Sequence, residues 1–117
     1  MTILNQYEVT LSKYAFDQLD EIRQYYEFDL FLPHVAHKLL SEIENAVNSL
    51  KTLPSRMPVV ALEPWRSEGI RKMVVGQYIL YYWIDEGKSH VVVTAAVSAK
   101  SDQFMQLANM MYNFSDE

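Results

Sequence analysis

The apolar residues of this 117-residue chain change their spacing near its middle, and this change constrains the fold more than any other feature. Up to residue 50 they recur at steps of three and four, which places them along one face of a helix. Beyond residue 70 they fall into three short segments rich in valine and tyrosine, which are typical of strands. A helical half followed by a sheet half predicts an α+β domain.

The helical half contains two amphipathic segments after a short alternating stretch, Tyr7–Leu11, that predicts a strand. The first helix is expected over Ser12–Phe28, with the Ser12 hydroxyl as its N-cap. The second is expected to begin at Pro33, which needs no backbone N–H there, and to end near Pro54. Their apolar stripes consist of Ala15, Leu19, Ile22 and Tyr26 in the first, and Ala36, Leu39, Leu40, Ile43, Val47 and Leu50 in the second. Two such helices joined by a short connection predict a helical hairpin.

The sheet half begins after a loop, residues 54–68, that contains three prolines and no periodic pattern. We expect Trp65 to anchor this loop. Three strands are predicted at Ile70–Val75, Gln77–Asp85 and Ser89–Val97, separated by Gly76 and by the sequence DEGKS, whose glycine suits a hairpin turn.

A last helix is predicted over Ser101–Phe114, where the apolar residues Phe104, Leu107, Met111 and Phe114 have helical spacing. We therefore expect one domain over residues 1–117: an N-terminal strand and a helical hairpin, packed on one face of an antiparallel sheet of about four strands. If any part is disordered, we expect it to be residues 1–6 and 115–117.

Composition limits the classes of partner. The net charge of −5 disfavours broad nucleic-acid binding, which needs many cationic contacts to phosphate. A basic or polar partner suits the chain better. Without cysteine there is neither a disulfide nor a thiolate metal site. We see no signal peptide and no apolar run long enough to span a bilayer, so we expect a cytoplasmic protein without a membrane partner.

The run GIRKMVVGQYILYYWIDEG, Gly69–Gly87, carries a family resemblance together with the helical hairpin, the SLKTLP that ends its second helix, and the valine-rich strand that follows. In this order, over residues 7–102, these features resemble the RelE/ParE superfamily, the toxins of bacterial type II toxin–antitoxin pairs. The resemblance implies a toxin neutralised by a cognate antitoxin that folds across its sheet and hairpin. It also implies that a homodimer or a two-to-two toxin–antitoxin assembly can form.

Two activities occur in the superfamily. RelE-like members cut messenger RNA in the ribosome, with cationic side chains on the central strands and after the last strand. ParE-like members inhibit DNA gyrase. Here Arg71 and Lys100 match cationic positions and would be catalytic if the chain were a ribonuclease. Ile79 occupies another such position and cannot stabilise an anion, which makes the nuclease set incomplete and favours the ParE-like side.

Several side chains near the quoted run are candidates for binding a target or the antitoxin: Arg66, Lys72, Tyr81 and Trp83. The aromatic residues could stack on bases or anchor an antitoxin segment. They could equally be core and cross-strand pairs of the sheet, which is the commoner role of such residues. One of Arg71 and Lys72 should face solvent, because neighbouring side chains of a strand point to opposite faces.

No cofactor or metal is expected. His34 and His37 share a helix face, but no cysteine or HExxH pattern accompanies them, and a solvated pair explains them. The sequence therefore favours a growth-inhibiting toxin with DNA gyrase or another non-nucleolytic target. A ribosome-dependent messenger RNA endoribonuclease and an inactive relative that only binds its partner remain the alternatives, so that enzymatic activity stays open.

Overall fold

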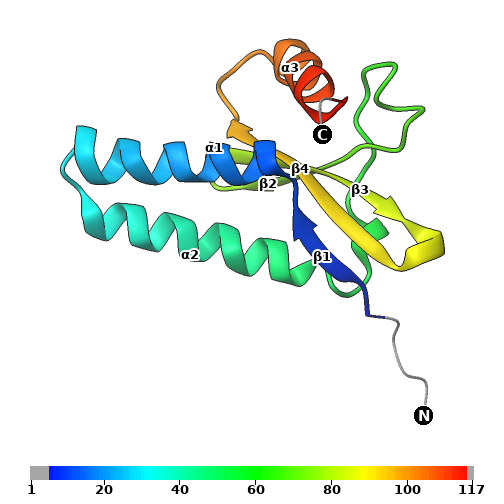
Figure 1. The fold of residues 1–117 in the computed structure, drawn as a ribbon, viewed down its shortest axis with the longest axis horizontal. Coiled ribbons are helices and arrows are strands. Elements are labelled where there is room, and N and C mark those ends of the chain that lie inside the picture. Colours follow the sequence, from blue (N-terminus) through cyan, green and yellow to red (C-terminus); the bar gives the residue numbers. More distant parts are fainter. Residues whose placement is uncertain (1–5, 116–117) are drawn as a thin grey trace.

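The structure, a computed structural model, describes residues 6–115 (Figure 1). The termini for which we considered disorder, residues 1–6 and 115–117, lie outside this range except for Gln6 and Ser115. The predicted order of elements is confirmed, and with it the α+β class. The elements are β1 (Glu8–Leu11), α1 (Lys13–Gln24), a π-helical turn (Tyr25–Asp29), α2 (Pro33–Ser49), β2 (Arg71–Val75), β3 (Tyr78–Asp85), β4 (His90–Ser98) and α3 (Gln103–Ser115).

The four strands form one sheet in the order β1–β4–β3–β2. The pairs β2–β3 and β3–β4 are antiparallel, as predicted, but β1 runs parallel to β4, so the sheet is mixed. The helical hairpin separates β1 from the other strands in sequence. No tight turn therefore forces β1 to run against its neighbour, and it can join the edge in the parallel sense.

The helical hairpin begins where the sequence predicts. The Ser12 hydroxyl accepts a hydrogen bond from the backbone N–H of Ala15 at 3.0 Å, and Pro33 occupies the first turn of α2. The first helix, however, changes to π-helical geometry at Tyr25, so α1 itself ends four residues before the predicted Phe28. Phe31, with φ of 55°, then turns the chain into α2.

One face of the sheet packs on the helical hairpin. Tyr82, Val93 and Leu80 lie at the centre of this core, and each of the three is fully buried. Ala15 of α1 and Ile43 of α2 contact them from the predicted apolar stripes. Burial of such side chains contributes roughly 1.5–3 kcal/mol each.

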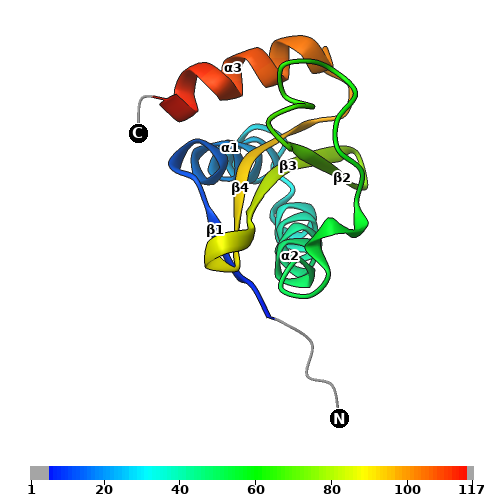
Figure 2. The same cartoon turned by 90° about the vertical axis from the view of Figure 1, so that its right-hand side faces the viewer.

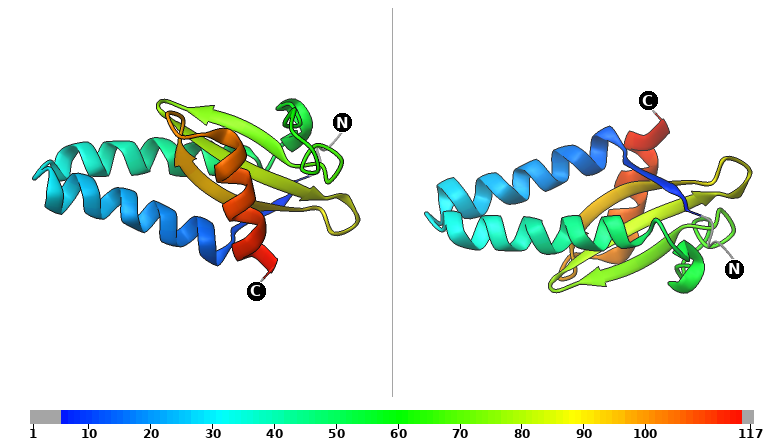
Figure 3. Two further views of the ribbon diagram at one scale, coloured as in Figure 1. Left: turned by 90° about the horizontal axis from the view of Figure 1, so that it is seen from above. Right: turned by 90° about the horizontal axis from the view of Figure 1, so that it is seen from below.

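The opposite face is also covered, which differs from the expected one-sided sheet. Here α3 and the loop before β2 pack on Tyr81, Ile79 and Ala95 (Figures 2 and 3). Trp65 anchors the loop as predicted: it is 3% exposed and meets Phe104 of α3 edge to face. The apolar stripe of α3 is shifted from the predicted one, because Phe104 is half exposed while Leu107 and Met110 are buried. The side chains of Met111 and Phe114 lie outside the described part.

The two hairpin turns use different residues for their left-handed backbone. Gly76 turns β2 into β3 with φ of 60°, as its position predicts. In DEGKS the residue with positive φ is Ser89 and not the predicted Gly87. The Asp85 carboxylate accepts from the backbone N–H of Lys88 and holds a short 3₁₀ turn. The residue with left-handed backbone therefore comes after this turn, at Ser89.

Candidate functional site

The two cations predicted for a ribonuclease lie beside opposite ends of the β2–β3 pairing. Arg71 pairs with Tyr82, whereas Lys100 follows Ser98, the partner of Tyr78. Tyr78 and Tyr82 are four residues apart on β3, which separates the two ends by about 13 Å. The fold therefore does not bring Arg71 and Lys100 to one phosphate-sized site.

Arg71 has a structural environment. Its guanidinium donates to the backbone carbonyl of Ser55 at 3.1 Å and to that of Met57, both in the loop after α2. Tyr82, directly opposite on β3, donates its hydroxyl to the Pro54 carbonyl of the same loop. Together these contacts join the loop to this end of the sheet. Lys100, by contrast, is exposed in the turn that follows β4.

The predicted binding residues divide between surface and core. Lys72 and Tyr81 are cross-strand neighbours on the face that carries α3. Lys72 is half-buried, and Arg66 is exposed on the loop that covers this face. Trp83 is half-buried against the same core. Tyr81 is fully buried and donates its hydroxyl to the side-chain oxygen of Gln106 at 3.1 Å, so it offers a partner no surface in this conformation.

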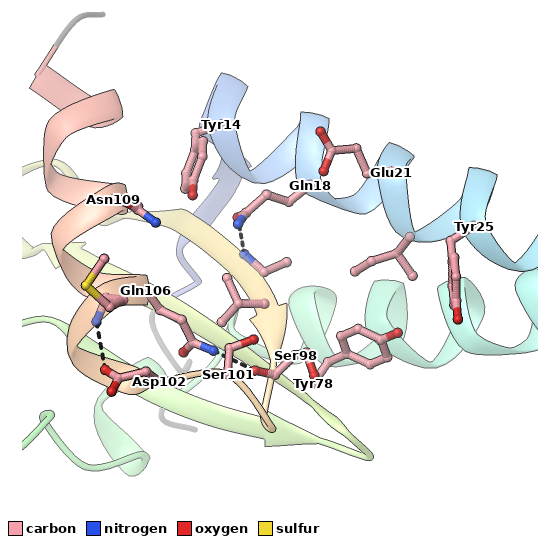
Figure 4. A pocket seen from close by; sticks show the side chains of 14 residues that line it. Tyr14, Gln18, Glu21, Tyr25, Tyr78, Ser98, Ser101, Asp102, Gln106 and Asn109 are labelled. Atoms are coloured by element: carbon pink, nitrogen blue, oxygen red, sulfur yellow. Dashed lines mark hydrogen bonds between the residues drawn. The ribbon is translucent and has the colours of Figure 1, made fainter.

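Sequence reasoning missed a cleft between α1 and α3, at the end of the sheet away from Arg71 (Figure 4). Its volume is about 440 Å³, within the range of small-ligand sites. One wall comes from the helical hairpin, the floor from the ends of β3 and β4, and the other wall from the start of α3. The main lining residues are Tyr14, Gln18, Glu21, Ile22, Tyr25, Tyr78, Ala96, Val97, Ser98, Asp102, Met105, Gln106 and Asn109.

The cleft walls are fixed by two glutamines. The Gln18 side-chain oxygen accepts from the backbone N–H of Ala96 at 2.8 Å, which ties α1 to β4. The Gln106 amide donates to the Ser98 carbonyl at 2.6 Å, while its oxygen accepts from Tyr81. Gln106 thus joins α3 to both central strands. These glutamines have no local sequence pattern, since each acts on a segment distant in sequence.

A β-bulge accompanies this arrangement. Tyr81 pairs with Ala95 and Tyr82 with Val93, which leaves Thr94 as the extra residue on β4. Its hydroxyl donates to the carbonyl of Tyr81 at 3.2 Å. A bulge increases the local twist of a strand, and here it precedes the segment that forms the cleft floor. No alternation pattern in the valine-rich strand marks this position.

The cleft is acidic and aromatic. Among the described residues no lysine, arginine or histidine lines it, while Glu21 and Asp102 do. Burial, followed by the nearby Glu21 carboxylate, raises the pKa of the Tyr14 hydroxyl. The pKa of Tyr78 is also raised, first by burial and then by its hydrogen bond to the Tyr26 hydroxyl. Both phenols are therefore neutral at physiological pH. Among the described lining residues, an anion such as phosphate would meet two carboxylates and no cation.

A second groove, of about 400 Å³, lies between the two long helices and is mainly apolar. Phe16, 60% exposed, and Leu19 of α1 face Leu40 and Val47 of α2 across it. Arg23 lines its edge, but the guanidinium is already paired with two carboxylates of its own helical segment, Asp20 at 3.0 Å and Glu27 at 2.8 Å.

The family profile described as ParE toxin of type II toxin–antitoxin system, parDE, matches residues 9–104. The chain belongs to this toxin family. The resemblance to the RelE/ParE superfamily is thereby confirmed. No curated protein gives a significant match to the chain.

Solved structures show the same fold in toxin–antitoxin systems. The chromosomal ParDE system from P. aeruginosa matches with a TM-score of 0.67 and 16% identity, covering 82% of this chain and 99% of that one. The toxin–antitoxin complex RelBE2 from Mycobacterium tuberculosis matches with a TM-score of 0.59 and 20% identity, covering 86% and 100%. Identities this low establish the likeness of fold alone.

Two further findings concern the described residues. None of their helices is long and apolar enough to cross a membrane. Nor do they contain a group of three or more histidine, aspartate or glutamate side chains placed to hold a metal ion. His34 and His37 are both exposed on α2.

Proposed function

We propose that this ParE-family chain inhibits bacterial growth by binding a protein target, DNA gyrase, and does not cut messenger RNA. The observation that carries the proposal is the separation of Arg71 from Lys100 by about four residues along β3. A ribonuclease must gather cations around the attacked phosphate, where charge develops in the transition state. This chain instead has an acidic cleft beside the end of β4.

Further features support a binding function. Ile79, at a position that is cationic in RelE-like enzymes, is buried in the core on the α3 side and supplies no charge. One nitrogen of the Arg71 guanidinium donates to two loop carbonyls, which gives this side chain a role in holding the fold. The net charge of −5 also disfavours ribosomal RNA as a docking surface.

We further propose that a cognate antitoxin neutralises the chain by laying an amphipathic segment into the groove between α1 and α2. The apolar side chains of Phe16, Leu19, Leu40 and Val47 provide the anchor sites that helix-in-groove recognition needs. The related solved structures are described as toxin–antitoxin systems, which supports a protein partner of this kind.

The antitoxin surface can be tested by co-purification with the antitoxin encoded by the neighbouring gene. A Phe16→Asp substitution places a charge in the groove and should weaken the complex by tenfold or more, because an apolar anchor is lost and a carboxylate is desolvated. Val74→Asp is the matched control, since Val74 is equally exposed but lies on β2. Equal effects of the two substitutions would contradict the groove assignment. Light scattering of the complex would show whether it is two-to-two.

The gyrase target can be tested with purified components. The chain should inhibit supercoiling of relaxed plasmid by gyrase, and added antitoxin should restore it. Lys100→Ala should inhibit as well as the parent chain. Uninhibited gyrase together with arrested growth would mean another target, and no growth arrest at all would identify a relative that only binds its partner.

A further inference from the structure

The cleft between α1 and α3 has an apolar floor below an acidic rim. Ile22 and Val97 supply aliphatic surface, whereas Glu21 of α1 and Asp102 before α3 stand on opposite walls (Figure 4). An occupant that satisfies both parts needs an aliphatic stem and a cationic head. Lysine and arginine side chains have this construction.

The negative charge of the cleft is available to a ligand. Within the described part of the chain, the side-chain carboxylate of Glu21 makes no hydrogen bond or ion pair. Asp102 uses one carboxylate oxygen to accept from the backbone N–H of Met105 at 3.0 Å, which leaves the second oxygen open. The Gln18 and Gln106 side chains are bound to the backbone of β4, so they do not neutralise the carboxylates.

Three tyrosines add a second kind of attraction for cations. Tyr14 and Tyr25 extend from the wall formed by the helical hairpin and Tyr78 from the sheet, and all three border the cleft (Figure 4). The electron-rich face of a tyrosine ring attracts a cation, most strongly where water is partly excluded. The phenols of Tyr14 and Tyr78 stay protonated because their pKa values are raised, and their oxygens can still accept hydrogen bonds.

We propose that this cleft binds an arginine side chain presented by a protein partner of the toxin. The stem would lie over Val97, and the guanidinium would lie between the tyrosine rings and a carboxylate. Arginine fits better than lysine because its planar fork binds a carboxylate through two parallel hydrogen bonds and stacks on aromatic rings. The inference deepens the proposed function. It rests on that function in one respect, namely that the partner is a protein. The net charge of −5 favours such a basic partner.

The inference is tested on the purified, ¹⁵N-labelled chain by NMR titration with Nα-acetyl-arginine amide. Amide shifts should be confined to the cleft, and affinity should fall about fivefold or more in Glu21→Gln, which removes a charge-assisted hydrogen bond. Asp102→Asn, which keeps an N-cap acceptor for α3, should also weaken binding. Glu68→Gln, the same change on an exposed loop residue, should leave it unchanged.

Three related probes make the test decisive. The citrulline analogue has the shape of arginine without its charge and should not bind, and the lysine analogue should bind more weakly. Mg²⁺ should give no localised shifts. Equal binding of citrulline, an affinity insensitive to Glu21→Gln, or shifts spread over the surface would each overturn the inference. Because no gyrase is present, such a failure would leave the proposed function to be judged by the supercoiling assay.

Discussion

The pairing of β3 with β2 ends at Tyr78 on one side and at Tyr82 on the other, and these two tyrosines have opposite environments. Tyr82 is fully buried and donates its hydroxyl to the carbonyl of Pro54, while Arg71 beside it binds two further carbonyls of the same loop. Tyr78, at the other end, has a long 3.4 Å hydrogen bond to the Tyr26 hydroxyl and borders the open cleft.

This difference shows where the polar groups of the chain serve structure and where they are available for function. At the Tyr82 end, the tyrosine hydroxyl and the cation that resembles a catalytic residue both donate to carbonyls of one loop and stabilise it. At the Tyr78 end, carboxylates and aromatic rings line an open cleft. A cation in the sequence is therefore weak support for catalysis until its partners are known.

The largest expected effect comes from truncating the buried tyrosine. Tyr82→Ala should lower the free energy of unfolding by about 3–5 kcal/mol, because it removes a ring from the core and leaves a loop carbonyl without its donor. Tyr25→Ala, at the half-exposed cleft wall, should cost under about 1 kcal/mol. Urea denaturation measures both. Similar losses would mean that the two ends are not distinct in packing.

Removing the cation at the Tyr82 end, Arg71, should affect stability more than activity. Arg71→Ala should cost about 1–3 kcal/mol, because the carbonyls of Ser55 and Met57 lose a charged donor. The folded fraction should inhibit gyrase as the parent does. Arg66→Ala, on the exposed loop, should change stability by less than about 0.5 kcal/mol. Unchanged stability in Arg71→Ala would contradict its structural role.

The caps of α1 and α3, Ser12 and Asp102, offer a smaller test of the difference between a buried structural group and an exposed group at the cleft. Ser12 is buried, accepts from Ala15 and donates to the Thr94 carbonyl at 3.1 Å, so Ser12→Ala should cost about 1–2 kcal/mol. Asp102 caps the exposed start of α3, and Asp102→Ala should cost about 0.5–1 kcal/mol. Thermal or urea unfolding can rank the two. A larger loss from Asp102→Ala would reverse the contrast.

The smallest effect is a pH dependence at the cleft end. Because the folded pKa of Tyr78 is raised, this residue contributes stability that is present below its unfolded pKa near 10 and is lost as the pH rises further. Tyr78→Phe should therefore lose less stability than the parent between pH 9 and pH 11. Urea midpoints at the two pH values test this, since the lysines that titrate in this range are common to both proteins. An identical loss in the two proteins would contradict the shifted pKa.

Local patterns predicted most of the fold because local physics determines those parts. The Ser12 cap, the start of α2 at Pro33 and the turn at Gly76 each depend on a few neighbouring residues. The parallel placement of β1 and the covering of both sheet faces depend on contacts between distant segments. Spacing along the chain contains no such information.

The site was harder to predict than the fold. The cleft needs the bulge at Thr94 and the hydrogen bonds of Gln18 and Gln106, none of which has a sequence signature. The sequence could not show that Tyr81 is more deeply buried than Trp83, because strand alternation places both on one face. The covering by α3 then buries the first fully and the second partly.

The central claim is that the chain inhibits growth by binding a protein and not by cutting messenger RNA. It is tested most directly by inducing the chain alone in a bacterium and mapping messenger RNA 5′ ends within minutes. We predict arrested growth with intact transcripts. New 5′ ends inside codons, abolished by Arg71→Ala or Lys100→Ala in a folded protein, would contradict the claim and identify a ribosome-dependent endoribonuclease.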